Sequence, residues 1–506
     1  MRKAKLYFVN GLLVAAVGLL LRFAGMAYNV YISGKLGAEG MGLLSLVSSV
    51  YALALTLAVS GVNLTCTRLV AEALSSGSPA EARRSLKGCA LYALFFGLCS
   101  AALLFFLAPF IGEKILVQPR AVLCLRALCP ALAAASLSSC FSGYLTAARK
   151  AGRTAFSSIP GEGLKLLFTI VLFSFLLSRG MGAEAVMIAS CLSELCSFFI
   201  LCLILFFELR KNLPKTGRTL DALPRRLFGV ALPLAFAAWV RSALVTAEHV
   251  LIPKGLRRSE SENALADYGV MHGMALPVVF FPYAILAPFT SLLMPEISRF
   301  KARKEEKDIA FVSSLTLRMT LIFASGCSAL LAAFGRELGL LLYGNPDAGR
   351  TIALFAFLIP VMYTDTATDS LLKGLGEQVY CMKVNIADAA LSLLLVLVAV
   401  PRLGALGYLL TVFVSECVNT FFSVLKLAKK TRLFVPLFSS IALPLLCAFL
   451  AALASRRLLL LLHPGARAFL LLALFLFPAL YLPLLVLTRA FRREDRRYLL
   501  RLFKKS

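Results

Sequence analysis

Charged residues are scarce in this chain of 506 residues. Asp, Glu, Lys and Arg together make up 16%, whereas 60% of the chain is hydrophobic. A soluble globular protein carries about 25% charged residues, so the composition excludes both an ordinary soluble enzyme and a disordered protein. The apolar residues fall in blocks of about twenty, which is the length that crosses a bilayer as a helix. The sequence therefore predicts an all-α, polytopic membrane protein.

The motifs of an enzyme or of a nucleotide-driven pump are also absent. The sequence contains no GxxxxGK[ST] phosphate-binding loop, and no segment outside the apolar blocks is long enough to form a catalytic domain. The three histidines lie far apart, and the thirteen cysteines form no CxxC pair or Cys/His cluster with metal-ligand spacing. We therefore expect a transporter driven by gradients, neither an enzyme nor a protein with a bound organic cofactor.

The N-terminal apolar run lacks the features of a cleavable signal peptide. It extends from Leu6 to about Ile32 without an A-x-A cleavage site. Because this is longer than the apolar core of a signal peptide, we expect a first membrane helix here.

Apolar blocks predict fourteen spans, an even number that places both termini on one side of the membrane. Their limits are 6–33, 40–65, 86–111, 120–146, 155–178, 184–208, 227–252, 268–296, 309–334, 350–373, 380–400, 404–427, 434–456 and 467–488.

The strong positive charge fits the membrane interpretation. The net charge of +27 comes from 53 Lys and Arg against 26 Asp and Glu, and most basic residues lie in alternate short loops. Such a bias marks the cytoplasmic loops, so we predict that both termini are cytoplasmic and that the chain binds no nucleic acid.

The longest basic loop, 209–226, divides the predicted helices into two lobes of six, 1–208 and 227–427. A terminal helix pair, 428–488, and a basic cytoplasmic tail, 489–506, follow. Glu162 lies twelve residues after Lys150, and Asp388 lies eleven after Glu377. This weak echo is typical of transporters with internal repeats, whose substrates bind between the halves.

Basic residues inside the spans are the first candidate site. Each costs about 2.5–3.5 kcal/mol at mid-span, so it usually faces a cavity or a partner. Arg22, Lys165 and Arg241 lie near mid-span, whereas Arg126 and Arg318 lie closer to span ends and could extend to the surface. Together they predict a cationic cavity for an anion such as phosphate. The alternative is internal neutralisation, for example of Lys165 by Glu162 three residues earlier.

Acidic residues inside the spans form the second candidate set: Glu162, Glu194, Glu248, Asp365, Asp369, Asp388 and Glu416. Asp365 and Asp369 share a helix face, and with Asn385 and nearby hydroxyls they could coordinate Na⁺ or relay protons. Salt bridges to the cations are the alternative.

Prolines predict irregular helices. Span eight carries Pro277, Pro282, Pro288 and Pro295, and proline removes a ladder hydrogen bond, so we expect this span to be bent and able to act as a gate. Pro233 and Pro360 are candidate hinges of spans seven and ten.

Short motifs spread over nearly the whole chain resemble one known group of proteins. They are 22–25 (RFAG), 34–42 (GKLGAEGMG), 67–72 (TRLVAE), 268–269 (YG), 273–277 (GMALP), 281–282 (FP), 294–298 (MPEIS), 372–376 (LKGLG) and 401–407 (PRLGALG). In this order they resemble the stage V sporulation protein B group. That group belongs to the multidrug/oligosaccharidyl-lipid/polysaccharide exporter superfamily, which includes the MurJ lipid II flippases.

The resemblance implies fourteen helices in two lobes around a cationic cavity, and alternating access. It also implies flipping of an undecaprenyl-diphosphate-linked sugar to the outer leaflet of a bacterial cytoplasmic membrane. Arg22 matches a cavity-facing arginine of the family's first helix, but the family's second arginine, six positions later, is replaced by Tyr28. The basic residue common in the MurJ eighth helix is also absent, with Pro277 near its place. Glu248, Asn385 and Asp388 are the nearest matches to the family's sodium site, although the Asn–Asp spacing is three here and four in the family.

The resemblance also implies that the terminal helix pair forms a groove for the lipid tail.

Three functions remain open from the sequence. The first is a lipid-linked oligosaccharide flippase with Arg22, Lys165 and Arg241 on the diphosphate, and Arg126 and Arg318 guiding it. The second is a Na⁺- or H⁺-coupled antiporter for drugs or organic cations. The third is a membrane scaffold that recruits cell-wall or spore-coat enzymes. Membrane lipids are partners in each case, and no pattern indicates an oligomeric state.

Overall fold

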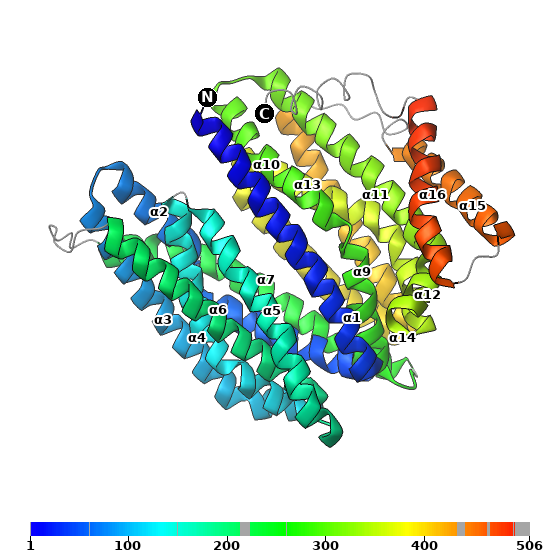
Figure 1. Cartoon of the computed structure of the whole chain (residues 1–506), viewed down its shortest axis with the longest axis horizontal. Coiled ribbons are helices and arrows are strands. Elements are labelled where there is room, and N and C mark those ends of the chain that lie inside the picture. Colours follow the sequence, from blue (N-terminus) through cyan, green and yellow to red (C-terminus); the bar gives the residue numbers. More distant parts are fainter. Residues whose placement is uncertain are drawn as a thin grey trace. The chain divides into compact units, whose positions relative to one another are not determined.

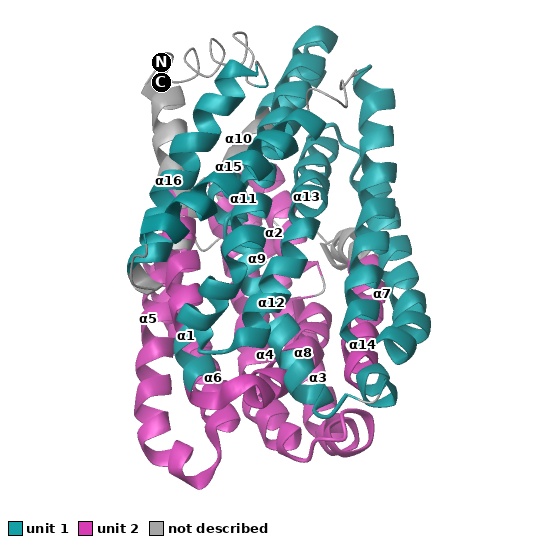
Figure 2. Cartoon of the chain, turned by 90° about the vertical axis from the view of Figure 1, so that its right-hand side faces the viewer, with its two compact units in different colours: residues 1–12, 29–34, 254–506 teal, residues 13–28, 35–253 magenta. Residues whose placement is uncertain are grey.

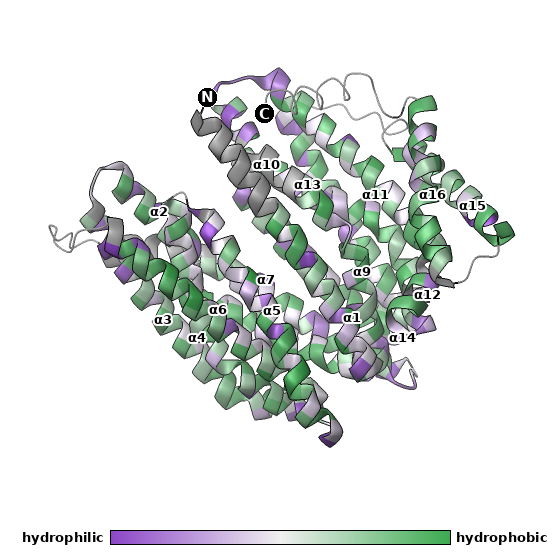
Figure 3. Ribbon diagram, viewed as in Figure 1, coloured by the Kyte–Doolittle hydropathy of each residue, from purple (hydrophilic) through white to green (hydrophobic). Residues whose placement is uncertain are grey.

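The computed structural model describes residues 2–59, 61–148, 150–212, 223–259, 261–432, 441–462, 466–488 and 490. These residues are helical apart from short turns and contain no strand. The predicted all-α class is therefore confirmed. Hydrophobic residues cover most of the ribbon, as expected for helices surrounded by lipid (Figure 3).

The helices follow one another along the chain with short connections. The first half contains α1 (Arg2–Val59), α2 (Val62–Ser75), α3 (Pro79–Pro109) with a π-helical extension (Phe110–Ile115), α4 (Arg120–Ala147), α5 (Ala151–Leu176), α6 (Gly182–Asn212) and α7 (Leu223–Arg258). The second half contains α8 (Ala264–Tyr268), a π-helical segment (Gly269–Ala275), α9 (Leu276–Phe280), α10 (Tyr283–Ala302), α11 (Glu306–Tyr343), α12 (Pro346–Phe355), α13 (Ile359–Gly374), α14 (Gln378–Thr431), α15 (Leu443–Leu462) and α16 (Ala466–Leu487).

Two glycines reconcile these helices with the fourteen predicted spans. Eleven helical stretches of the described chain are long and apolar enough to cross a membrane, but two of them are 60 and 54 residues long. Each contains a glycine with non-helical dihedral angles, Gly37 (φ 68°, ψ −174°) and Gly404 (φ 59°, ψ −134°), a conformation nearly restricted to glycine. Each long stretch therefore supplies two spans. The segmented helices α8 to α10 supply the fourteenth.

The chain divides into two compact units (Figure 2). Unit 1 contains residues 1–12, 29–34 and 254–506, and unit 2 contains residues 13–28 and 35–253. The division falls inside α7, after Pro253.

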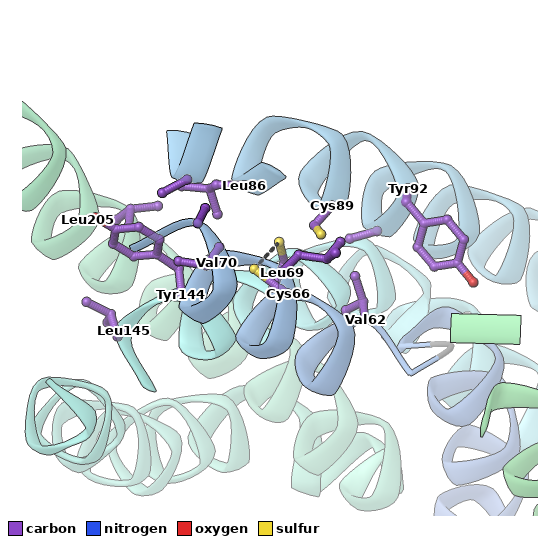
Figure 4. Close-up of a cluster of buried hydrophobic side chains, with 14 of the residues drawn as sticks. Val62, Cys66, Leu69, Val70, Leu86, Cys89, Tyr92, Tyr144, Leu145 and Leu205 are labelled. Carbon is purple, nitrogen blue, oxygen red and sulfur yellow. Dashed lines mark hydrogen bonds between the residues drawn. The ribbon is translucent and has the colours of Figure 1, made fainter. Parts of the chain in front are cut away.

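In unit 2, α4 packs against α2, α3 and α6 (Figure 1). A core cluster forms where α2, α3 and α4 meet, around Cys66, Val70, Cys89 and Tyr144 (Figure 4). The Sγ atoms of Cys66 and Cys140 are 3.9 Å apart. All thirteen cysteines are described and all are free thiols, so most of them fill space as small apolar groups, as the sequence predicts.

In unit 1, the terminal pair α15 and α16 packs against α11. The Tyr481 hydroxyl of α16 donates a 2.8 Å hydrogen bond to the carbonyl of Ile322, and Arg456 of α15 pairs with Glu337 at 3.2 Å. Aromatic and charged contacts therefore attach this pair to the unit. The basic linker and tail predicted at 209–226 and 489–506 lie largely outside the described residues.

Span eight is interrupted, as its prolines predict. The helix stops at Phe280 and resumes at Tyr283, and the bonds between these points tighten to i→i−3, as from Ile285 N–H to the Pro282 carbonyl at 3.0 Å. The Tyr363 hydroxyl donates a 2.7 Å hydrogen bond to the Val279 carbonyl, next to the break. A side chain of α13 thus satisfies a carbonyl where the ladder is broken.

The other proline predictions have different outcomes. Pro360 lies in the first turn of α13, where a 3₁₀ segment (Ala356–Leu358) separates α12 from α13 in span ten. Pro233 does not interrupt α7, which is continuous from Leu223 to Arg258, and the hinge in span seven stays a prediction.

Small residues bring α11 and α12 into close backbone contact. Gly335 and Gly339 face Gly349 and Ala353, and each pair has the i,i+4 spacing that lets membrane helices approach. A Cβ at Gly339 would collide with the backbone of Gly349, and one at Gly349 would lie 2.6 Å from the Arg336 carbonyl oxygen.

We expect Gly339→Ala to destabilise the protein by about 1–3 kcal/mol, because the two backbones must move apart. Gly163→Ala is the matched control. It places the same methyl group in α5 with no atom within 4 Å, so it should leave stability unchanged or raise it. Thermal unfolding of the purified variants in detergent measures both effects, and an unchanged midpoint for Gly339→Ala would contradict the packing described here.

Candidate functional site

Lys165 is held in unit 2 by contacts between α1 and α5. The Lys165 ammonium lies 4.8 Å from the centroid of the Tyr28 ring. The Tyr28 hydroxyl is 2.9 Å from the hydroxyl of Thr169, which itself donates a 2.8 Å hydrogen bond to the Lys165 carbonyl one turn earlier. Because the Thr169 hydroxyl already donates its only proton to the Lys165 carbonyl, Tyr28 is the donor in the Tyr28–Thr169 hydrogen bond. The fixed ring then gives the ammonium a cation–π contact worth about 0.5–2 kcal/mol.

Acidic residues lie near Lys165 without forming a close ion pair. Glu194 of α6 interacts electrostatically with Lys165 and with Glu162. Among the described residues, no acidic oxygen lies within 4.0 Å of the Lys165 ammonium, and the salt bridge to Glu162 that was the alternative interpretation does not form. The lysine therefore keeps its charge available in a partly acidic environment.

Arg22 and Arg241 are more open than Lys165. Arg22 lies on α1, six residues before Tyr28, and Arg241 lies on α7. Both side chains are exposed, and neither forms an ion pair with any acidic residue in the described part of the chain. Unit 2 thus contains all three mid-span cations, and the structure does not neutralise the two arginines.

The two peripheral arginines differ in environment. Arg126 of α4 is exposed, and its guanidinium carbon lies 5.0 Å from the centroid of the Phe105 ring. Arg318 of α11 belongs to unit 1 and is only 5% exposed. Its side chain is therefore enclosed and does not extend to the surface, although its position near a span end would have allowed this.

The acidic candidates are distributed over both units. Glu248 belongs to unit 2, whereas Asp365, Asp369, Asn385 and Asp388 belong to unit 1. Asp369 pairs with Lys373 at 2.8 Å, and Asp388 accepts a hydrogen bond from Ser415. The Asn385 amide donates to the Cys381 carbonyl of its own helix at 2.8 Å. Over the described residues, no three His, Cys, Asp or Glu side chains gather closely enough to hold a metal ion.

Comparison with known proteins identifies the family. Residues 8–294 match the family model described as polysaccharide biosynthesis protein. The chain belongs to this family. As a member of the polysaccharide biosynthesis protein family, it is homologous to stage V sporulation protein B of Bacillus subtilis (strain 168). The two are 24% identical over 422 residues, which cover 81% of each chain. The resemblance seen in the sequence motifs is confirmed.

Solved structures show the fold of this family member. The lipid II flippase MurJ in an inward closed conformation has a TM-score of 0.73 at 13% identity, covering 95% of this chain and 100% of that one. An inward-facing MATE multidrug resistance transporter of the MOP superfamily has a TM-score of 0.64 at 13% identity, covering 83% and 99%. A MOP superfamily transporter from Pyrococcus furiosus has a TM-score of 0.59 at 14% identity, covering 83% and 94%. The chain therefore has the multi-pass fold that MurJ and MATE transporters share.

Tyr28 and Thr169 are site residues that the sequence did not reveal in this family member. Tyr28 stood out only because it replaces a basic residue of the resembling group, and Thr169 has no signal beyond its i,i+4 spacing from Lys165. The structure shows that the charge beside Tyr28 comes from α5, since the Lys165 ammonium covers its ring.

Glu208 is the third residue that sequence reasoning missed. It lies at the C-terminal end of the predicted span six, is 4% exposed, and forms ion pairs with both Lys150 and Arg153. A carboxylate so deeply buried needs both partners. The two basic residues, predicted as part of a cytoplasmic turn, thus join the start of α5 to the end of α6.

Proposed function

We propose that this protein is a flippase. It moves an undecaprenyl-diphosphate-linked saccharide, similar to lipid II, from the inner to the outer leaflet of a bacterial cytoplasmic membrane by alternating access. Both chain ends then lie in the cytoplasm, as the loop charges predict. The observation that carries the proposal is the pair of exposed mid-span arginines, Arg22 and Arg241, which form no ion pair within the described chain.

Chemistry supports a diphosphate at these residues. Guanidinium groups bind phosphate oxygens through two parallel hydrogen bonds, and such charge-assisted bonds are the strongest that side chains form. Lys165 adds a compact point charge that Tyr28 orients. Arg126, whose side chain is exposed, is proposed to guide the substrate. Outward movement of each negative charge gains about 2.3 kcal/mol per 100 mV of inside-negative potential.

The fold supports the same class of substrate. The structure of the lipid II flippase MurJ matches nearly the whole chain, and the family model describes polysaccharide biosynthesis. A Na⁺ or H⁺ gradient is the proposed source of energy, with Glu248, Asn385, Asp388, Asp365 and Asp369 as the candidate coupling residues.

A reconstituted assay tests the proposal. The purified full chain is inserted into vesicles with a fluorescent lipid II or another undecaprenyl-diphosphate-linked saccharide, and quenching from outside reports the lipid's leaflet. We expect protein-dependent translocation of at least one of these lipids, with a rate that responds to a Na⁺ or proton gradient. Transport of cationic dyes together with no movement of any undecaprenyl-linked lipid would instead identify an organic-cation antiporter.

A further inference from the structure

An asparagine of α1 contacts the interrupted span eight within unit 1. The Asn29 amide donates a 3.0 Å hydrogen bond through Nδ2 to the Gly273 carbonyl, which lies in the π-helical segment Gly269–Ala275. At the end of α11, the Tyr343 hydroxyl donates a 3.1 Å hydrogen bond to Asn29 Oδ1. Both polar atoms of the amide therefore have a partner, and the buried tyrosine fixes which way the amide faces.

Pro277 explains why the Gly273 carbonyl is bonded from another helix. In a regular α-helix this carbonyl would accept from the N–H of residue 277, four positions later, but proline has no N–H. Gly273 is buried, where a carbonyl without a donor is destabilising, and Asn29 supplies a donor. The Tyr363 hydroxyl does the same for Val279. Side chains of two other helices, α1 and α13, thus hold the bend of span eight.

Asn29 also marks the point at which α1 changes unit. Residues 13–28 of α1 belong to unit 2, and the helix enters unit 1 at Asn29. The preceding residue, Tyr28, donates to Thr169 and contacts the Lys165 ammonium within unit 2. Two consecutive residues therefore attach α1 by side-chain hydrogen bonds, one in each unit. Because they point in directions about 100° apart around the helix, together they fix the rotation of α1 about its axis.

Arg22 lies on the same face of α1 as Asn29. The two residues are seven positions apart, which is close to two full turns and leaves them about 20° apart around the axis. The chain is helical between them, since the break in α1 comes later, at Gly37. Arg22 is exposed and forms no ion pair with a described residue, so the direction in which it points depends on the rotation of the helix that carries it.

We propose that Asn29 is a positioning residue for Arg22. Its hydrogen bonds with Gly273 and Tyr343 fix the rotation of α1, and the Arg22 guanidinium then meets the diphosphate with both of its parallel N–H groups. Asn29 itself does not contact the substrate. The inference rests on the proposed function and adds that one side chain couples the bend of span eight to the arginine that binds the substrate.

The vesicle assay, run with the full chain at several mole fractions of fluorescent lipid, tests this role. Asn29→Leu should raise the mole fraction needed for half-maximal translocation by about tenfold, the ratio expected when one hydrogen bond to a charged group is lost. Tyr343→Phe, which keeps the bond to Gly273, should shift it less but in the same direction. Asn63→Leu is the matched control, because the Asn63 amide of α2 also donates a 3.0 Å hydrogen bond to a carbonyl of another helix, that of Ser139. It should lower the unfolding temperature without changing the half-maximal mole fraction.

Pro277→Ala separates positioning from stability. Added to Asn29→Leu, it returns an N–H four positions after the Gly273 carbonyl, so the unfolding temperature should recover. The half-maximal mole fraction of lipid should stay raised, because α1 is still not held at position 29. Recovery of both quantities would show that Asn29 only satisfies a carbonyl. If Asn29→Leu alone does not fold, this double variant and Tyr343→Phe provide the test.

Combination with Arg22→Ala shows through which residue Asn29 acts. In the Arg22→Ala background, Asn29→Leu should cause no further shift, because the guanidinium that it positions is gone. A second tenfold shift would show that Asn29 acts independently of Arg22. Equal shifts in Asn29→Leu and Asn63→Leu, or none in Asn29→Leu, would also overturn the proposal. A wild-type protein that moves no undecaprenyl-linked lipid would instead contradict the proposed function, so the two failures are distinguishable.

Discussion

Replacing Arg22 by Ala is expected to reduce lipid translocation by about 10- to 150-fold. A hydrogen bond to a charged group contributes about 1.5–3 kcal/mol, and each 1.4 kcal/mol corresponds to a factor of ten. Arg22 is exposed on α1 and forms no ion pair with a described residue, so its replacement removes a substrate contact without breaking an ion pair within the described chain. Arg22→Lys keeps the charge but not the two-pronged geometry, and it should retain part of the activity.

Complementation measures this effect in a cell that depends on the protein, and the vesicle assay measures it directly. Arg68→Ala is the matched control, because it also removes one positive charge but breaks only an exposed i,i+4 pair with Glu72 at the end of α2. Cells that depend on the Arg68→Ala variant should grow normally. Full complementation by Arg22→Ala at normal protein levels would show that this arginine does not bind the diphosphate.

The double variant Lys150→Ala/Arg153→Ala is expected to lose about 3–5 kcal/mol of stability. Both side chains pair with Glu208, which is 4% exposed, and their removal takes two positive charges away from a buried carboxylate. Adding Glu208→Gln should restore much of the loss, because a neutral amide is cheaper to bury than an anion.

Denaturant or thermal unfolding in detergent reports the loss. Arg350→Ala provides the comparison, since its pair with Asp347 is exposed on both sides and should contribute less than about 1 kcal/mol. A double variant that unfolds together with the wild type, or a triple variant no more stable than the double, would refute the role given to Glu208.

The number and order of the membrane spans could be predicted from the sequence, because each span requires an apolar stretch long enough to cross the bilayer. Apolar blocks gave the fourteen spans, and the proline-rich stretch gave the interruption in span eight. The glycine break at Gly37 falls in the predicted connection between spans one and two, and Gly404 is the first residue of predicted span twelve. Pro233 leaves α7 uninterrupted, because a proline removes one hydrogen bond but does not by itself end a helix.

The candidate site was only partly predictable, since side-chain partners depend on tertiary contacts. Charge in an apolar span drew attention to Arg22, Lys165 and Arg241, but the sequence could not show that all three belong to unit 2. The Tyr28–Thr169 bond joins residues 141 positions apart, and Glu208 meets its partners across 55 and 58 positions. Periodicity and composition contain no information about such pairs.

The single-residue reversal at Gly404 has a practical consequence. The chain turns back there with no separate loop between its helical arms, residues 378–403 and 405–431, so a tag inserted at that end of the hairpin would push the two arms apart. Topology mapping by accessible tags should therefore use connections between separate helices, where an inserted sequence would not force the two arms of α14 apart.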